Sequence, residues 1–149
     1  GKTLHFTYPT NVKLHDGQPV TKDDVEFTFN SYNKASNYGI TSIEFPKEGE
    51  CIIKFEKEKG LSFLNGLTIT GVLLPKHIWE GKDLDTYVGE DAVIGCGPYK
   101  FVSYDKDAQI SYYESVGDYY KGEITVDKVS IHTYTGQEAL VMALSAKRR

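Results

Sequence analysis

A tight turn placed just before a helix start, between Val12 and Val25, constrains the fold of this chain more than any other feature. The turn is carried by Asp16-Gly17, a strong turn signal because glycine accepts a positive φ without steric strain. Such a turn lets an extended segment reverse before the next element begins. We therefore expect an extended segment to end here and a helix to follow directly.

The helix start is set by Thr21 and Asp24, which are spaced as in a capping box. Alternating apolar residues in this stretch would also fit a strand. The spacing of Val25, Phe29 and Tyr32 fits one face of a helix. Because acidic residues also suit the positive end of a helix dipole, we predict a helix over residues 21–35.

Short alternating stretches separated by turns indicate strands, and two pairs of them form expected hairpins. A second capping box, Thr135 to Glu138, opens a second expected helix, Pro75 to Trp79 suits a short helical turn, and Leu61 to Leu74 has no assignment. This pattern predicts an α+β fold: a mixed, mainly antiparallel sheet with two main helices. The expected strands are Thr3–Tyr8, Val12–Leu14, Ile40–Phe45, Glu50–Glu56, Tyr99–Tyr104, Gln109–Glu114 and Thr125–Tyr134.

Charge and composition exclude several classes of protein. The net charge of −4 gives no electrostatic footprint for nucleic acid. No apolar run approaches the roughly 20 residues of a membrane-spanning helix. The histidines are not spaced as metal ligands, and Cys51 and Cys96 form no CxxC motif. We expect no metal and no cofactor, and the spacing of the two cysteines leaves their pairing open.

Four segments, in order along the chain, resemble extracellular solute-binding protein family 5, the oligopeptide-, dipeptide- and nickel-binding components of ABC importers. The first is similar to the family's "V-K-F-H-D-G-x-P-[FL]-T-A-E-D-V" signature, and the third departs by carrying Cys96 where the family usually has threonine. The fourth carries Tyr120 in place of the usual tryptophan. The segments are Val12–Val25, Leu74–Glu80, Ile94–Phe101, and Asp118–Gly122 with Val126–Val129.

The resemblance implies a fragment of a longer protein with a type II periplasmic-binding-protein fold. About residues 1–98 would form the additional domain beside the first lobe, and about residues 99–149 part of the first lobe. The implied function is capture of peptides or similar small solutes, delivered to ABC permease subunits. The implied location is extracellular or periplasmic, with the full-length protein anchored as a lipoprotein.

The resemblance also suggests positions that line the ligand cleft: Asn37 and Tyr38 after the first helix, and Thr70 further on. No tight motif fixes the register at these places, so they are positional predictions. Cys96 between two glycines leaves open a small cysteine-dependent hydrolase, which would need a histidine placed nearby in space. A stand-alone interaction domain is the other alternative. We expect a binding protein and not an enzyme.

Overall fold

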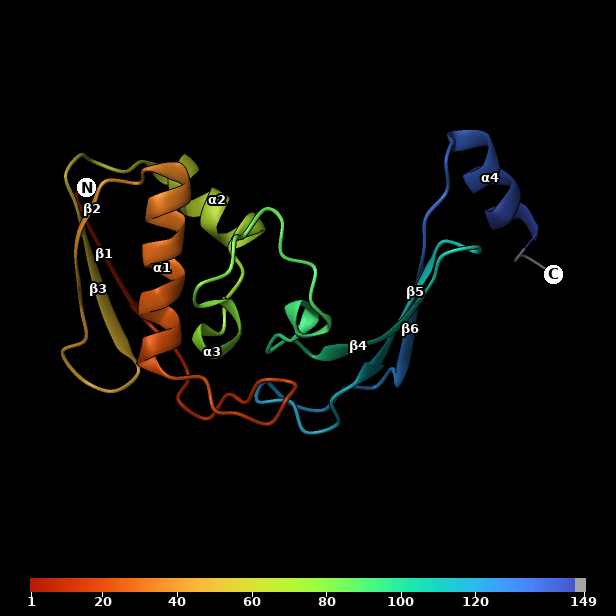
Figure 1. Ribbon diagram of the computed structural model, residues 1–149, viewed down its shortest axis with the longest axis horizontal. Coiled ribbons are helices and arrows are strands. Elements are labelled where there is room, and N and C mark those ends of the chain that lie inside the picture. The colour runs from red at the N-terminus through yellow and green to blue at the C-terminus, as the bar shows by residue number, and fades with distance from the viewer. Residues whose placement is uncertain (147–149) are drawn as a thin grey trace. The chain divides into compact units, whose positions relative to one another are not determined.

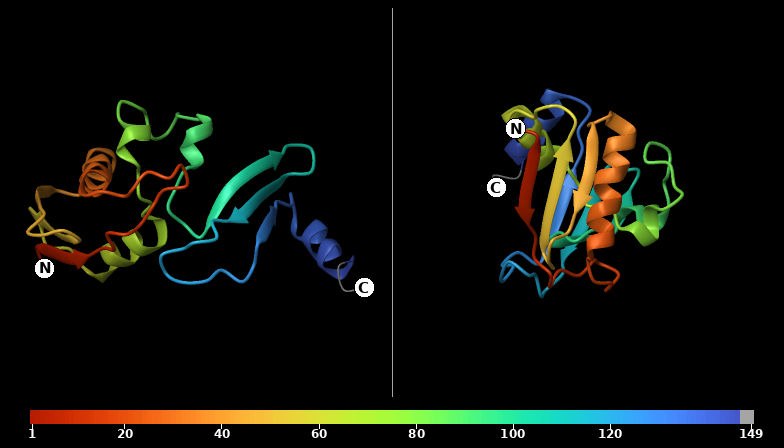
Figure 2. Two further views of the ribbon diagram at one scale, coloured as in Figure 1. Left: turned by 90° about the horizontal axis from the view of Figure 1, so that it is seen from below. Right: turned by 90° about the vertical axis from the view of Figure 1, so that its left-hand side faces the viewer.

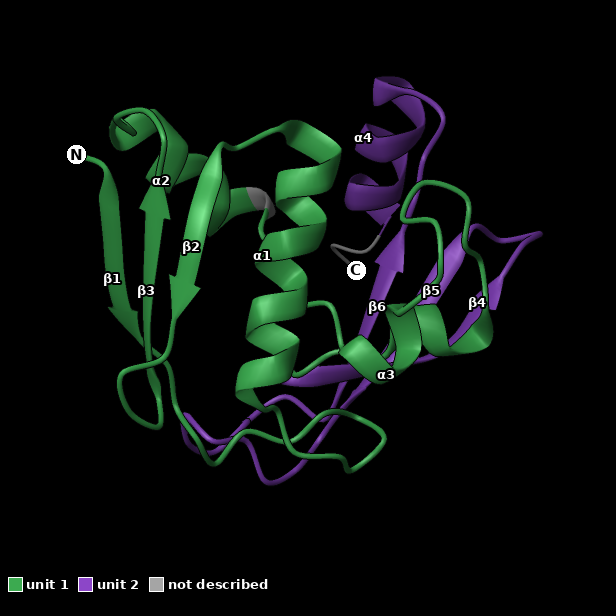
Figure 3. Ribbon diagram, turned by 60° about the vertical axis from the view of Figure 1, so that its left-hand side comes forward, with its two compact units in different colours: residues 1–96 green, residues 97–149 purple. Residues whose placement is uncertain are grey.

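The computed structural model describes residues 1–146, apart from the side chain of Thr70. The chain forms two compact units, unit 1 (Gly1–Cys96) and unit 2 (from Gly97 onward), drawn in green and purple in Figure 3. Each unit contains one three-stranded sheet, with its strands and helices labelled in Figure 1. Within residues 1–146, no helix has the length and apolar character to cross a membrane.

The sheet of unit 1 is antiparallel, and its central strand is the third in sequence. β2 (Ile40–Glu44) and β3 (Glu50–Phe55) form the first predicted hairpin, which closes at Gly49 with a φ of 74°. A Cβ atom at Gly49 would lie 2.9 Å from the carbonyl oxygen of Tyr8, so this turn requires glycine. From edge to edge (Figure 2, right), the strands are β1 (Thr3–Thr7), β3 (Glu50–Phe55) and β2 (Ile40–Glu44).

Helix α1 (Lys22–Ser36) covers one face of this sheet and closes the core of unit 1. β3 turns alternate side chains toward the helix, and Cys51 and Ile53 are completely buried there. Val25 of α1 packs against these two side chains and belongs to the same core. Burial of these apolar side chains supplies the main stabilisation of the unit.

Both ends of α1 are capped by its own sequence. The Asp24 carboxylate accepts a hydrogen bond of 2.8 Å from the Thr21 backbone N–H, so the predicted capping box is confirmed. At the other end, Asn37 adopts the left-handed conformation, with a φ of 47°, and its N–H donates to the Asn33 carbonyl. Asparagine tolerates this conformation better than most residues, which accounts for the helix stopping there.

The stretch that had no assignment from sequence contains a helix, α2 (Leu61–Thr70), and an extended segment, Gly71 to Pro75. Gly66 and a predominantly apolar composition hide the helical period here. The Phe63 ring packs edge-on against Phe55 at 5.3 Å and supports α2 from the sheet. A short helix, α3 (Lys76–Trp79), confirms the expected helical turn, and a 3₁₀ turn, η1 (Glu90–Val93), follows.

Unit 2 is built on an antiparallel sheet of β4 (Tyr99–Asp105), β5 (Ile110–Ser115) and β6 (Lys128–His132), in that order. The second predicted hairpin is confirmed, with a bulge between Phe101 and Ser103. β6 is shorter than the predicted strand Thr125–Tyr134, because only five of its residues pair along β5. The elements are β4 (Tyr99–Asp105), β5 (Ile110–Ser115), β6 (Lys128–His132) and α4 (Gln137–Ala146).

The predicted α+β class with antiparallel pairing is confirmed, and the structure adds detail to it. The strands divide between two sheets, and α2 joins the two helices that were expected. The expected strand Val12–Leu14 is wrong as a strand: only a single bridge, from Lys13 to Pro19, forms there. The Asp16-Gly17 turn occupies the residues between, which leaves too few for a ladder.

Candidate functional site

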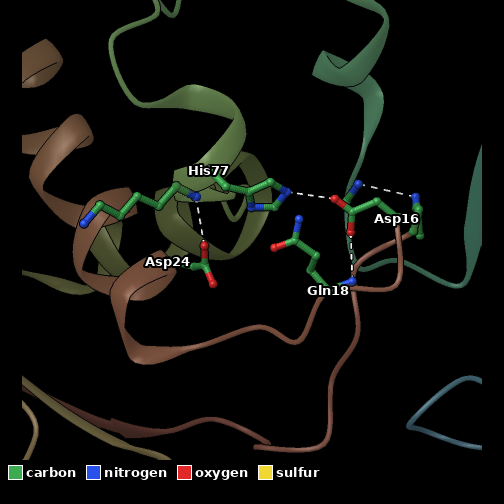
Figure 4. Close-up of polar contacts among 7 residues, drawn as sticks. Asp16, Gln18, Asp24 and His77 are labelled. Carbon is green, nitrogen blue, oxygen red and sulfur yellow. Dashed lines mark hydrogen bonds and ion pairs between the residues drawn. The ribbon is translucent and has the colours of Figure 1, made fainter.

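A polar junction forms where the Asp16 turn meets α3, as Figure 4 shows. The Asp16 carboxylate accepts from the Gln18 backbone N–H at 3.0 Å and lies 2.8 Å from His77 Nε2. Partial burial raises the pKa of Asp16, but the hydrogen bonds from Gln18 and His77 outweigh it and the pKa lies below its ordinary value. Asp16 is therefore held as a carboxylate that fastens the turn to α3.

Asp24 makes a second connection at the same end of α1. Its Oδ1 atom accepts from the Lys76 backbone N–H at 2.8 Å, and its Oδ2 atom accepts from the Thr21 backbone N–H and hydroxyl. The residue is only 5% exposed. One carboxylate thus caps two helices at once, because α1 and α3 both begin beside it.

His15 fastens the turn to the last residues of unit 1. Its backbone N–H donates to the Gly95 carbonyl at 2.9 Å, and its Nδ1 atom accepts from the Gly95 N–H at 3.3 Å. The residues of the Asp16 turn therefore connect α3 on one side with the segment before Cys96 on the other. These bonds use His15, Asp16 and His77 to position backbone.

Further along α1, side chains of the helix bond to the backbone of residues 72–76, which are the end of the extended segment and the first residue of α3. The Thr28 hydroxyl accepts from Leu74 N–H at 2.9 Å, donates to the Asp24 carbonyl at 2.7 Å, and lies 3.4 Å from the Leu74 carbonyl. The Tyr32 hydroxyl accepts from Val72 N–H at 2.7 Å and donates to its carbonyl at 2.6 Å. With the bond from Lys76 to Asp24, three helix positions spaced by four meet three backbone positions spaced by two.

The two spacings match because of chain geometry. Four residues of a helix rise about 6 Å, and two residues of an extended chain span about 6.6 Å. Side chains of α1 therefore replace a neighbouring strand as partners for the segment. We name the contacts of Asp24, Thr28 and Tyr32 with residues 72–76 the α1 ladder.

The sequence predicted Asp24 as a cap and Tyr32 as part of the helix, but not the bonds that Thr28 and Tyr32 make to residues 72–74. Their spacing of four from Asp24 was a signal of a shared helix face. Nothing in the sequence indicated that a second segment runs along that face.

The C-terminal end of α1 brings together two of the regions predicted to line a ligand cleft. The Tyr38 ring lies 6.4 Å from Tyr32 and meets Phe63 of α2 edge-on at 5.1 Å. Tyr32 in turn bonds Val72, two residues after Thr70. Loop 37–38 therefore lies beside the first turn of α2, and the backbone that follows α2 lies beside Tyr32, an arrangement that only the fold reveals.

The three predicted cleft residues differ in what the structure says of them. Asn37 is exposed and ends α1 in the left-handed conformation. This structural role accounts for an asparagine at the position, with no need for a ligand contact. Tyr38 is half-buried in the aromatic group just described. The side chain of Thr70 lies outside the described part of the structure, so the placement of Thr70 in the cleft stays a prediction.

The chemistry of the two cysteines does not favour a nucleophile. Both thiols are free. Burial raises the pKa of Cys51 to about 11, with Glu26 adding to the effect, and burial also raises the pKa of Cys96. A cysteine nucleophile acts as a thiolate, and a raised pKa reduces that form at neutral pH. Within residues 1–146, no group of three or more histidine, cysteine or acidic side chains is arranged to hold a metal ion.

Comparison with known families identifies the chain. Residues 1–148 match the model of the bacterial extracellular solute-binding proteins, family 5 Middle. The chain therefore belongs to this family, whose similar members are described as binding proteins.

Two relatives show how much of this chain and how much of a longer protein are matched. The oligopeptide-binding protein AppA of Bacillus subtilis is 30% identical over 147 residues, which cover 91% of this chain and 27% of AppA. A putative ABC transporter peptide-binding protein of Brucella ovis is 31% identical over 154 residues, covering 95% of this chain and 29% of that protein. The chain thus spans a little over a quarter of the length of these relatives.

Solved structures share the fold across nearly the whole chain. The structure of Bacillus subtilis AppA in complex with a nonapeptide matches with a TM-score of 0.80 and 27% identity, covering 99% of this chain and 31% of AppA. NikZ of Campylobacter jejuni, solved with Ni(L-His), matches with a TM-score of 0.81 at 23% identity, covering 99% of this chain and 31% of NikZ. At that identity the second match supports the fold alone.

Proposed function

We propose that this chain is part of an extracellular solute-binding protein that captures peptides or similar small solutes for an ABC transporter. The observation that carries the proposal is the family match over residues 1–148, together with the likeness to peptide-bound AppA over 99% of this chain. Solute capture needs no covalent chemistry, and the raised pKa values of both thiols agree with a binding role.

The two units have separate roles in this proposal. Unit 1, extended to about residue 98, is the additional domain beside the first lobe, and about residues 99–149 belong to the first lobe. Lobes of such proteins close over a ligand by a hinge, and the closed form is presented to permease subunits. The location would be outside the cytoplasmic membrane, with the whole protein anchored as a lipoprotein.

The corner formed by loop 37–38 and the end of α2 is the proposed ligand-facing part of unit 1. An aromatic group next to exposed backbone suits a peptide, because rings contact side chains of many kinds while polar atoms fix the orientation. Asn37, Tyr38 and Thr70 are the residues proposed to line it. Most of the cleft would be supplied by chain outside these 149 residues.

Mass spectrometry of solute that co-purifies with the whole protein tests the proposal. We expect peptides or another small solute bound to the wild type. The affinity of the whole protein for that solute should be reduced about tenfold by Tyr38→Ala. Tyr104→Ala in unit 2, at an exposed position, is the matched control and should keep full affinity. A whole protein that carries no solute and binds none from a peptide pool would overturn the proposal.

The isolated chain provides a second measurement. Because most of the cleft is missing, calorimetry of residues 1–149 against a mixed peptide pool should detect no binding heat. Micromolar binding would show that these residues form a complete site by themselves.

A further inference from the structure

The backbone of the segment 71–75 has two edges, and α1 uses only one of them. In an extended chain, the N–H and C=O groups of successive residues point to opposite edges. Val72 and Leu74 direct both of their groups to Tyr32 and Thr28 of α1. Leu73, between them, must direct its N–H and C=O away from the helix.

The main-chain groups of Leu73 are open in the described structure. No hydrogen bond among the described residues includes either its N–H or its C=O. The residue is half-buried, and its side chain packs against the core of unit 1. A donor and an acceptor are thus held side by side on a backbone that the α1 ladder and the core both fix.

We propose that the Leu73 backbone is a docking edge for the main chain of an extended peptide. Leu73 N–H donates to the carbonyl of one ligand residue, and Leu73 C=O accepts from the N–H of that same residue, as in an antiparallel pair. Every peptide carries these two groups, so the edge recognises the ligand's backbone and tolerates different sequences. This inference rests on the proposed function and adds how the ligand is recognised.

The length of the edge favours a short peptide over a second copy of the chain. Pro75 ends it on one side, because proline has no N–H to donate. On the other side, the Gly71 N–H is used to end α2, where it donates to the Leu67 carbonyl at 3.0 Å. Only one residue can pair, which is too little for strand exchange between copies but enough for one point of attachment within a larger cleft.

Exposed apolar side chains lie close to Leu73 in the sequence. Val72 is 65% exposed, and Ile69 of α2 is 82% exposed. Side chains of an extended ligand alternate along its length, so residues next to the paired one can contact this surface. In strand addition, main-chain hydrogen bonds supply affinity and contacts of the neighbouring side chains supply specificity.

Amide hydrogen exchange by NMR on the whole protein tests this inference. The probe is the pentapeptide Ala-Val-Ala-Val-Ala, with analogues N-methylated at one residue each. We expect saturating pentapeptide to slow exchange of the Leu73 amide at least about tenfold, with Val72 and Leu74 nearly unchanged because they are already bonded. One N-methyl position should weaken binding at least about tenfold, since it removes the N–H that Leu73 C=O accepts.

The possible failures are distinguishable. Pentapeptide that binds without slowing the Leu73 amide overturns this inference and leaves the proposed function standing. A Leu73 amide already protected without ligand shows that the protein itself or a second copy covers the edge, which also overturns it. A whole protein that binds no peptide at all overturns the peptide function and this inference together.

Side-chain variants give an independent check without disturbing the backbone. Val72→Ala should weaken pentapeptide binding several-fold, because it removes apolar contact beside the edge. Val88→Ala, at a position 93% exposed and on a different loop, is the matched control and should bind as the wild type does. Equal affinity for all three proteins would exclude ligand contact at Val72.

Discussion

The two units have similar sheets but differ in what covers them. In unit 1, α1 lies on the sheet and the core residues Cys51, Ile53 and Phe55 are at most 4% exposed. In unit 2, none of the described residues 97–146 is buried, and Ile131 of β6 and Met142 of α4 are 54% and 72% exposed. Three strands with a covering helix can close a core, whereas three strands without one leave both faces accessible.

The difference extends to polar groups. Unit 1 uses buried side chains, Asp24 and Thr28, to satisfy the backbone of another segment. The salt bridge of unit 2 between Lys100 and Glu114 spans two strands with both side chains more than 40% exposed. Buried bonds are costly to leave unmade, and exposed pairs contribute little. Unit 1 should therefore respond strongly to substitutions that leave unit 2 almost unchanged.

The largest expected effect comes from the core. Ile53→Ala should lower the free energy of unfolding of unit 1 by about 2–5 kcal/mol, because it opens a cavity at a completely buried position. In the same 149-residue chain, Ile131→Ala in unit 2 should cost less than about 1 kcal/mol, because this side chain is 54% exposed there. Hydrogen exchange of β3 and β5 amides measures each unit separately. Equal costs would show that the contrast in burial is not a contrast in stability.

The second-largest effect on stability should come from Asp24, the shared cap of α1 and α3. Asp24→Ala should destabilise unit 1 by about 2–3 kcal/mol, because the N–H groups of Thr21 and Lys76 lose their acceptor. Glu114→Ala should change the stability of unit 2 by less than about 0.5 kcal/mol. Urea denaturation followed by β-sheet circular dichroism gives the comparison. A large effect of Glu114→Ala would contradict the division between buried and exposed bonds.

A smaller effect is expected from the α1 ladder. Thr28→Val keeps the shape of the side chain but removes the hydroxyl that bonds Leu74, and should cost about 1–2 kcal/mol. Thr28→Ser should retain most of the stability, since it keeps the hydroxyl. In unit 2, Ser130→Ala removes an exposed hydroxyl and should have no measurable effect. If Thr28→Val and Thr28→Ser behave alike, the hydroxyl is not the contributing group.

The smallest expected effect is a dependence on pH. The pKa of Asp16 in the folded chain lies below its ordinary value of 3.8, so its contribution to stability is complete above that value and is lost as the pH falls below it. Asp16→Asn should remove this part of the acid sensitivity of unit 1, an effect below about 1 kcal/mol. Hydrogen exchange between about pH 5 and pH 3 measures it. If the stability of Asp16→Asn falls with decreasing pH as steeply as that of the wild type, groups other than Asp16 cause the acid sensitivity.

Predictions from sequence succeeded where local chemistry decides the structure. The capping box of Thr21 and Asp24 and both hairpins depend on residues close together in the chain. The same reasoning failed for α2, whose helical period is hidden by apolar residues on every side. For the candidate site, it gave no sign that Tyr32 bonds Val72, because the two residues lie 40 positions apart in sequence.

The sequence by itself determined the class of fold, the start of α1, the turns and the family, since each follows from short-range patterns or from motifs in register. Only the tertiary structure decided that the strands divide into two sheets, that α1 serves as a partner for the segment 72–76, and that Leu73 keeps an open edge. The physical reason is that a side chain can bond any backbone of matching spacing, and the sequence of one segment does not reveal which distant segment comes to lie beside it.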